Sequence, residues 1–510
     1  MVKVKGKRWL LSAVAAGSMI AAVGCEAVGG VDLNGAVASM YDVQSSEGTM
    51  NLRWDIAGDA ADAEGDRILQ AFGSGAIGVT EMLQEDEQTV SMEGELQLPK
   101  GNLPFSFYMN EDELVVDVEG AVKPFKLDLT STFGAEASAD LPFDASQLSD
   151  VLQQDAGREA VKKLIAYVAS HVPNPASTTV GTTTETIDGA TKTLAKVTME
   201  ADFEELLGML ATAIGNVASD EAGLKELIGS LYDTLKPVLG ELTGASEDPF
   251  MSQLMDNKTL MVELIYTSLA PELQSLAEEL QSSATEEMEL PFSADSGLKV
   301  ELLLDGAQPA GMNVGLVLEP AEGEADGLES IRIELESRWW NVNGDVDAKT
   351  YVGAAADFPL DAKPRDRLDN IEKDSLLYDI LKNDLRATRH AFDMYMGENA
   401  SVPDGVSPYI KGAGTTMVPV RYVSEQLDAT VGWDGATQTI TIADAEEGIT
   451  IEMVVGKTTA TVNGQETALP EAPEIINQST FVPIAFITKA LGGKAEWNGS
   501  LGIVTITKEF

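Results

Sequence analysis

The sequence predicts an α+β protein in which a large domain, made of an antiparallel sheet and helices, precedes a small duplicated α/β domain. Three observations support this class. Short runs alternate apolar and polar residues early and late in the body of the chain, and apolar residues recur at three- and four-residue spacing between those runs. The last fifth of the sequence contains a repeat. A length of 510 residues, 44% of them hydrophobic, is enough for about three to four domains of ~150 residues.

The chain is strongly acidic. It has 83 Asp and Glu residues against 34 Lys and Arg, which gives a formal net charge of -49. This excess excludes a nucleic-acid binder, because such proteins need a basic face. Only 23% of the residues are charged, so the chain is not a disordered acidic tail.

Residues 1–24 have the features of an export signal. Four basic residues precede position 9, and residues 9–24 form an uncharged run of apolar and small residues. A membrane-crossing helix needs about 20 apolar residues, so this run is too short to be one. It fits the hydrophobic region of a secretory signal instead.

The signal ends at Ala22-Val23-Gly24-Cys25, and Cys25 is the only cysteine of the chain. Small residues before a cysteine at this place resemble the lipobox of bacterial lipoproteins, although that family usually has a large aliphatic residue where this chain has Ala22. The resemblance implies that the Cys25 thiol carries a diacylglyceryl group. Such a lipid anchors a protein stably to the outer face of the cell membrane. The alternative is an ordinary signal peptide with an incidental cysteine.

Removal of the first 25 residues sharpens the charge. Thirty basic and 83 acidic residues remain, a formal charge of -53. Anionic lipid and wall polymers therefore repel the body of the protein, which stays in solvent while the lipid holds it at the surface.

Residues 25–45 are small and polar without clear periodicity, and we expect a tether there. From residue 49 to 132, short alternating runs predict an antiparallel meander with one solvated face. Residues 105–109 and 114–118 flank a polar turn, which indicates a hairpin.

The middle of the chain is predicted to be helical. Apolar spacing indicates helices within 145–170 and over 203–214, 221–239 and 258–280. Pro237 and Pro271 are expected to end or kink two of these helices. Strand patterns occupy 193–201, 298–302 and 331–335, and a closing helix is expected over 375–396.

Residues 46–398 therefore form one predicted α+β extracytoplasmic domain. Its plan is similar to that of bacterial lipoproteins whose curved half-barrel holds an apolar ligand against helices. That similarity implies an alternative function, the transport of a lipid or another apolar ligand.

The C-terminal repeat has an offset of 64 residues. Thr416-Met417-Val418-Pro419 and the helix after it recur as Thr480-Phe481-Val482-Pro483, and a later Trp and a β-branched run recur at the same offset. Each copy predicts a strand, a helix begun by the proline, a turn, a strand that carries Trp and a hairpin return. Asn463-Gly464 marks a further hairpin between the copies. We expect the two tryptophans to be matched core anchors.

These residues resemble the copper amine oxidase N-terminal-like domain, or stalk domain, over residues 404–508. Its motif pairs Val-Pro-x-Arg with a later Trp-Asp, and the residues that match it are Pro419, Arg421, Trp433, Asp434, Pro483 and Trp497. The second copy departs from the motif, with Ala485 in place of the Arg and Asn498 in place of the Asp. The resemblance implies a non-catalytic module of exported Gram-positive surface proteins that serves in wall binding or spacing.

No catalytic or metal-binding constellation is predicted, and we expect no cofactor. Copper amine oxidases hold copper with three histidines, but this chain has only His171 and His390. Neither histidine accompanies a nucleophile motif such as Gly-x-Ser-x-Gly.

The sequence thus predicts a surface lipoprotein without enzymatic activity. Its expected partners are the membrane, through the N-terminal lipid, and a wall polymer or surface protein.

Overall fold

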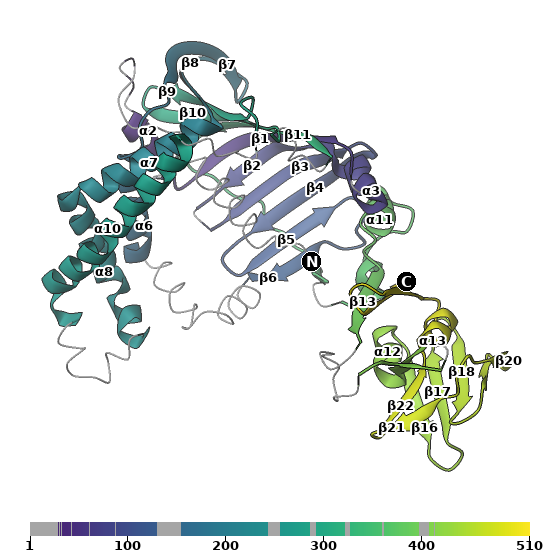
Figure 1. The fold of residues 1–510 in the computed structure, drawn as a ribbon. Helices are drawn as coiled ribbons and strands as arrows, with labels where there is room; N and C mark the ends of the chain where they lie inside the picture. The colour runs from purple at the N-terminus through teal and green to yellow at the C-terminus, as the bar shows by residue number, and fades with distance from the viewer. Residues whose placement is uncertain are drawn as a thin grey trace. The chain divides into compact units, whose positions relative to one another are not determined.

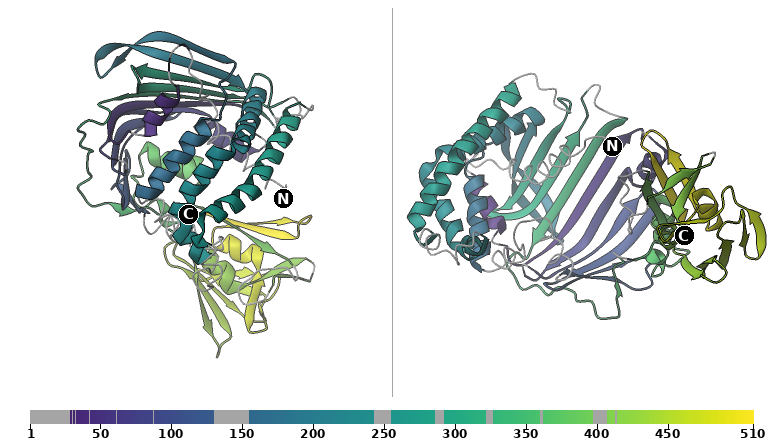
Figure 2. Two further views of the ribbon diagram at one scale, coloured as in Figure 1. Left: turned by 90° about the vertical axis from the view of Figure 1, so that its left-hand side faces the viewer. Right: turned by 60° about the horizontal axis from the view of Figure 1, so that its bottom comes forward.

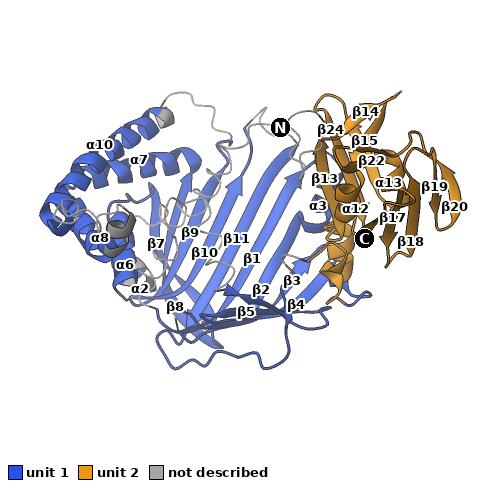
Figure 3. Cartoon of the chain, turned by 90° about the horizontal axis from the view of Figure 1, so that it is seen from below, with its two compact units in different colours: residues 1–358, 372–377 blue, residues 359–371, 378–510 orange. Residues whose placement is uncertain are grey.

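The computed structural model confirms the α+β class. It describes residues 29–129, 155–242, 255–285, 292–321, 327–396 and 407–510, apart from the positions 30, 32, 42, 61, 87, 360, 361 and 413. Cys25 and the predicted signal lie outside the described residues. The chain divides into two compact units, of which the first is Met1–Phe358 with Glu372–Leu377 and the second is Pro359–Ile371 with Tyr378–Phe510 (Figure 3).

A twelve-stranded sheet dominates the first unit (Figure 1). Its order is β12-β6-β5-β4-β3-β2-β1-β11-β10-β9-β8-β7, and every pairing is antiparallel except that of β12 with β6. The strands are β1 (Ser46–Gly58), β2 (Ser74–Gln84), β3 (Val90–Leu98), β4 (Gly101–Met109), β5 (Glu113–Val118), β6 (Phe125–Asp128), β7 (Ser177–Ile187), β8 (Ala190–Asp202), β9 (Gly297–Asp305), β10 (Gln308–Leu318), β11 (Leu328–Trp340) and β12 (Ala356–Asp357).

Two meanders build this sheet. Strands β1 to β6 follow one another in chain order, strands β7 to β11 do the same, and the pairing of β1 with β11 joins the two. The predicted hairpin is confirmed as β4 and β5. Its turn is held by the Asn110 side chain, which accepts hydrogen bonds from the backbone N–H groups of Asp112 and Glu113, both at 2.9 Å.

One face of the sheet is apolar from β8 to β4. Residues directly opposite in antiparallel strands share a face, and a single row of such pairs crosses eight strands. Leu52 of β1, for example, lies opposite both Leu335 of β11 and Ile77 of β2. The full row, in sheet order from β8 to β4, is Met199, Val300, Val314, Leu335, Leu52, Ile77, Leu96 and Leu103.

Five helices accompany the sheet at its β7–β10 end, where Figure 2 shows a curved sheet with the teal helices gathered at one side. They are α2 (Leu33–Tyr41), α6 (Asp155–Ala169), α7 (Phe203–Ser219), α8 (Glu221–Leu242) and α10 (Lys258–Thr285). Asp202 caps α7 by accepting a hydrogen bond from the Glu205 backbone N–H at 2.8 Å. Of the two expected effects of the prolines, an end or a kink, the structure excludes the end, since α8 continues past Pro237 and α10 past Pro271.

The tether prediction is wrong for residues 33–41, which form α2. Leu33 and Ala36, three residues apart, share one helix face and are buried against Val300 and Met199 of the sheet. The segment has too few large apolar residues to show a helical period, but one turn of contact is enough to dock it on an existing apolar face. The first unit therefore begins before residue 46.

The second unit is a duplicated fold with a pseudo-two-fold axis. Strands β15 and β22 pair antiparallel with Val418 opposite Val482, which are equivalent residues of the two copies, so the axis passes between them. The equivalent pairs of elements are β15 (Thr415–Pro419) with β22 (Ser479–Pro483), α12 (Val420–Gln426) with α13 (Ile484–Ala490), β16 (Thr430–Asp434) with β23 (Lys494–Asn498), and β17 (Thr439–Asp444) with β24 (Ile503–Glu509). The 64-residue repeat is thereby confirmed.

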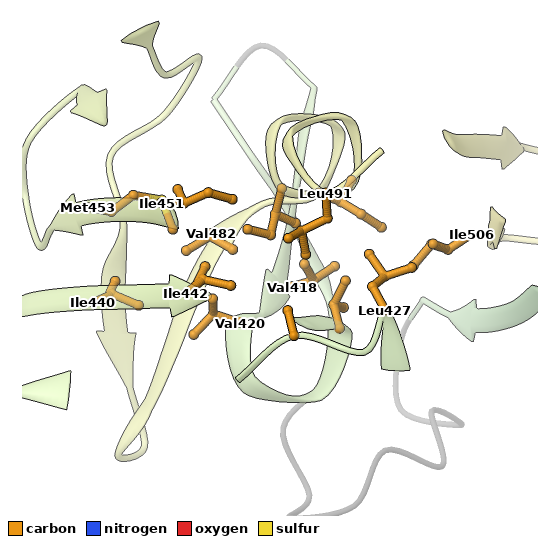
Figure 4. Packing of buried hydrophobic residues seen from close by; sticks show 14 of the residues in the cluster. Val418, Val420, Leu427, Ile440, Ile442, Ile451, Met453, Val482, Leu491 and Ile506 are labelled. Atoms are coloured by element: carbon orange, nitrogen blue, oxygen red, sulfur yellow. The ribbon is translucent and has the colours of Figure 1, made fainter. Parts of the chain in front are cut away.

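Short strands complete the second unit around one core. They are β14 (Tyr409–Lys411), β18 (Ile449–Val454), β19 (Thr459–Val462), β20 (Gln465–Ala468) and β21 (Glu474–Ile476). The predicted turn at Asn463-Gly464 links β19 to β20, with φ angles of 49° and 78°. Apolar side chains from both copies, including Val418, Ile442 and Leu491, fill the core (Figure 4).

The closing helix predicted over 375–396 is wrong. Only α11 (Leu376–Asp379) and a π-helical turn (Ile380–Asp384) are helical, and residues 389–395 form the strand β13 (Arg389–Tyr395). Arg386 has a φ of 48°, which ends the helical path. Beyond it, Phe392 and Met394 alternate with polar residues and point toward the core of the second unit.

Strand β13 pairs with β24 in the same way that β18 pairs with β17. Each copy thus has three strands paired in the same order, β16-β17-β18 and β23-β24-β13, but the third strand of the second copy comes from upstream of both copies. The second unit therefore starts well before residue 404, and it includes residues that the sequence assigned to the preceding domain.

Candidate functional site

The motif prolines lie where a strand becomes a helix. Pro419 and Pro483 each end a central strand and precede a helix, with φ of -61° and -64° and extended ψ values of 116° and 120°. A proline ring holds φ in this range and lacks an N–H that the first helical turn would leave unpaired. Both prolines are buried, so their role in the fold is structural.

A groove opens in the second unit between α12, β16 and the β21–β22 hairpin. Its volume is about 560 Å³. Its lining mixes apolar, aromatic and polar side chains, namely Pro419, Val420, Arg421, Tyr422, Glu425, Gln426, Val431, Gly432, Trp433, Ile440, Ile475, Gln478, Ser479 and Thr480. Three of the six predicted motif residues, Pro419, Arg421 and Trp433, are brought together here.

The prediction that Trp433 and Trp497 are core anchors is wrong. Their exposures are 45% and 50%. Trp433 lies opposite Ile440 in the β16–β17 pair, so the two side chains are on the same face of the hairpin. This is the face that points to the core, because Ile440 is buried. The residue pattern gave the correct face, but the seven-residue helix α12 leaves the groove open beside the indole.

Arg421 stands on the first turn of α12 at the groove. Its guanidinium lies 3.4 Å from the Glu425 carboxylate, one turn further along the same helix, and both side chains are more than half exposed. Screening by solvent makes such a pair worth at most about 1 kcal/mol. The pair therefore balances the charge of the groove more than it stabilises the helix.

Asp434 and Asn498 have the same role in the two copies. The Asp434 carboxylate accepts hydrogen bonds from the Thr437 hydroxyl at 2.7 Å and the Ala436 backbone N–H at 2.9 Å, which hold its pKa below the usual range. The Asn498 amide oxygen accepts from two backbone N–H groups of its own turn. The Asp-to-Asn departure of the second copy therefore preserves the turn, because both side chains can close it.

The turn that borders the groove is strained. Asn477 and Gln478 connect β21 to β22 with φ angles of 49° and 68°. A two-residue hairpin turn of this kind prefers glycine at its second position, because side chains disfavour positive φ. A glutamine here places an amide on the groove at a conformational cost.

A buried ionic cluster joins the two copies elsewhere in the second unit. The Asp444 carboxylate, 1% exposed, lies 3.0 Å from the Lys508 ammonium and 2.9 Å from the Arg365 guanidinium. Burial opposes ionisation of Asp444. Hydrogen bonds from Lys508, the Glu447 backbone N–H and Arg365 outweigh that effect and lower its pKa below the usual range.

Sequence reasoning missed this cluster, although a signal was present. Asp444 and Lys508 are 64 residues apart, so they occupy equivalent positions of the two copies. Equivalent residues near a pseudo-two-fold axis meet each other, as Val418 and Val482 do. An acidic and a basic residue at equivalent positions of the two copies therefore predict an ion pair across the axis.

The two histidines lie in different units and make ordinary contacts. His171 lies just after α6, with Nε2 3.3 Å from the Asp220 carboxylate and Nδ1 2.8 Å from the Tyr167 carbonyl oxygen. The Nε2 atom of His390, on β13 rather than on a helix, lies 3.3 Å from the Gln426 side-chain oxygen. Among the described residues, no group of three or more His, Cys, Asp and Glu side chains is arranged to hold a metal ion.

None of the helices within the described ranges is both long enough and apolar enough to cross a membrane.

Comparison with known proteins bears on the second unit alone. Residues 397–506 match the family model of the copper amine oxidase N-terminal domain. No curated protein matches the chain significantly. The matched range contains the groove, both tryptophans and the pseudo-two-fold axis, and it begins just after β13. The C-terminal region of this chain is therefore similar, over residues 397–506, to the copper amine oxidase N-terminal domain, which is a non-catalytic stalk-like module.

Proposed function

We propose that this chain is a non-catalytic lipoprotein of the bacterial cell surface, in which the first unit is displayed and the second unit binds the cell wall or serves as a spacer within it. The observation that supports wall binding is the groove of the second unit. It places a half-exposed tryptophan beside hydrogen-bonding side chains on the duplicated module. Exposed aromatic and polar groups that converge in a concavity are typical of binding sites.

The attachment to the membrane rests on the sequence. The basic start, the apolar run and the single cysteine at its end support export and lipidation at Cys25. The formal charge of -53 on the remaining chain supports a body held in solvent away from anionic polymers.

Sedimentation with purified cell wall tests the binding role. The experiment uses the full chain with the Cys25→Ala substitution, so that no lipid contributes to retention by the wall. We expect the protein to sediment with the wall in a saturable way. Retention should not weaken as salt rises, because salt screens the repulsion between an acidic protein and an anionic wall. Protein that stays in the supernatant at every wall concentration contradicts wall binding.

A second candidate function, a carrier of an apolar ligand, is favoured by the apolar face of the first unit. At β8–β10 this face is covered by Leu33 and Ala36 of α2 and by Leu206 of α7. Further along the same row, Leu52, Ile77 and Leu96 are only partly buried. A continuous apolar surface of this kind is unusual on a soluble domain and is a feature of ligand-binding proteins.

A small apolar pocket lies on the same face. Its volume is about 300 Å³, and its lining includes Met40, Met312 and Trp339. The next residue, Trp340, points to the other face, where it packs against Ile187 and Leu194. The two adjacent tryptophans therefore lie on opposite faces of the sheet.

Native mass spectrometry of the mildly extracted full chain tests the carrier function. If the chain is a carrier, the spectrum of the wild-type protein should show the added mass of a bound lipid. The Phe107→Glu variant should lose this added mass, because it places a charge on the apolar face of β4. The matched control is Ser106→Glu, an exposed neighbour whose side chain points to the opposite face. A wild-type chain without any bound mass contradicts the carrier function and leaves surface display.

A further inference from the structure

The groove of the second unit combines a flat aromatic surface with hydrogen-bonding side chains. Trp433 is 45% exposed and lines the groove, and Val431 and Ile440 contribute apolar surface to the same lining. Arg421 and Gln426 of α12 lie at the same groove. Such a lining suits a ligand that is itself amphipathic, with an apolar face and polar edges.

The charge of the groove is balanced. Arg421 and Glu425 are 3.4 Å apart and neutralise each other, and the lining holds no other charged side chain. An anion would meet one guanidinium already paired with a carboxylate, within a chain of strongly negative net charge. The ligand that fits is therefore uncharged, with hydroxyl or amide groups that both donate and accept hydrogen bonds.

The second copy of the repeat lacks this polar set. The residues equivalent to Arg421, Glu425 and Gln426, 64 positions later, are Ala485, Lys489 and Ala490. Trp497 nevertheless keeps the same strand position and a similar exposure. The fold therefore accounts for an exposed tryptophan in each copy, but it does not account for the polar side chains that surround only the first.

A strained residue supports the same assignment. Gln478 lines the groove with a φ of 68°, in a turn where glycine would be free of strain. Residues held in such conformations gather at binding sites, where the surrounding structure keeps them in place.

From these observations we infer that the groove binds an uncharged sugar ring of a wall glycan, stacked on Trp433. The hydroxyl or acetamido groups of the sugar hydrogen-bond to Arg421, Glu425 and Gln426. This inference rests on the proposed wall-binding function and names the class of polymer that the second unit recognises. Trp497, without a comparable polar set, does not bind the glycan.

Calorimetric titration of the full chain with a β-1,4-linked N-acetylglucosamine tetramer tests the inference. We expect saturable binding by the wild-type chain. Trp433→Ala should lower the affinity by about tenfold, because stacking on an aromatic ring contributes roughly that factor. Trp497→Ala is the matched control and should stay within about twofold of the wild type. Both side chains are half exposed, so neither replacement should change the thermal unfolding midpoint appreciably.

The outcomes separate this inference from the proposed function. An absence of tetramer binding, or an equal loss in the two tryptophan variants, overturns the sugar site even if the chain still sediments with whole wall. Tetramer binding that Trp433→Ala abolishes supports the sugar site, and failure to sediment with the wall would then count against wall binding alone.

Discussion

Replacement of Asp444 by alanine is expected to lower the free energy of unfolding of the second unit by about 3–5 kcal/mol, because it leaves two buried cations without their shared carboxylate. Lys508 is 3% exposed and Arg365 is 11% exposed, so water cannot replace the lost partner. The Lys508 ammonium would keep its hydrogen bond to the Leu427 carbonyl oxygen, at 3.1 Å, and its contact with the Phe510 ring, 4.5 Å from the ring centroid, but no carboxylate partner within its cluster.

Hydrogen exchange at the amides of β17 and β24 during denaturant titration measures this loss in the second unit itself. The matched control is Glu446→Ala. Its carboxylate lies 3.0 Å from the same Arg365 guanidinium but is 69% exposed, so its removal should cost no more than about 1 kcal/mol. Equal, small effects of the two replacements would show that the buried cluster does not stabilise the fold.

The same cluster predicts that the stability of the second unit depends on pH in the acid range. The pKa of Asp444 is lowered in the folded state, so its contribution to stability is present above the unfolded pKa of about 3.9 and is lost as the pH falls through the folded value. The wild-type second unit should therefore lose stability below about pH 4 more steeply than an Asp444→Asn variant. If the stability of the two proteins falls with pH to the same extent, the loss of stability in acid comes from other carboxylates.

The internal repeat made much of the second unit predictable. Both central strands, both helices and both tryptophan strands keep the 64-residue offset in the structure, because equivalent sequences adopt equivalent local conformations. The turn at Asn463-Gly464 was predictable for a local reason, the preference of these two residues for positive φ.

The exposure of Trp433 could not be predicted in the same way. Alternation along β16 gives the face of each residue, but coverage of that face depends on the length and position of α12, which the alternation does not encode. The sequence therefore indicated Trp433 as a motif residue, and only the structure showed it beside Arg421 at a groove.

The strand β13 was missed because its meaning depends on a distant partner. Leu376, Leu377 and Ile380 begin a true helical pattern, and the helix was extrapolated through the strand that follows. Residues 389–395 form a strand because β24, more than a hundred residues later, offers an unpaired edge. The helix α2 was missed for a similar reason, since its few apolar residues bury against the finished sheet.

The proposed surface display rests on membrane attachment through Cys25, and removal of this residue is expected to have the largest effect on where the protein resides. A diacylglyceryl group buries two long chains in the bilayer, and each buried methylene contributes about 0.8 kcal/mol, so its removal should release the protein from the membrane completely. The alternative, an ordinary signal peptide, predicts a protein that is exported without a lipid.

Metabolic labelling with a palmitate analogue, followed by membrane fractionation, tests this directly. We expect label in the wild-type chain and none in Cys25→Ala, which should appear in the medium. Ala22→Leu is the matched control, because it restores the aliphatic residue usual in a lipobox and should keep or increase the label. Unchanged labelling of the Cys25→Ala variant, or a wild-type chain without label, would contradict a lipid-anchored surface protein.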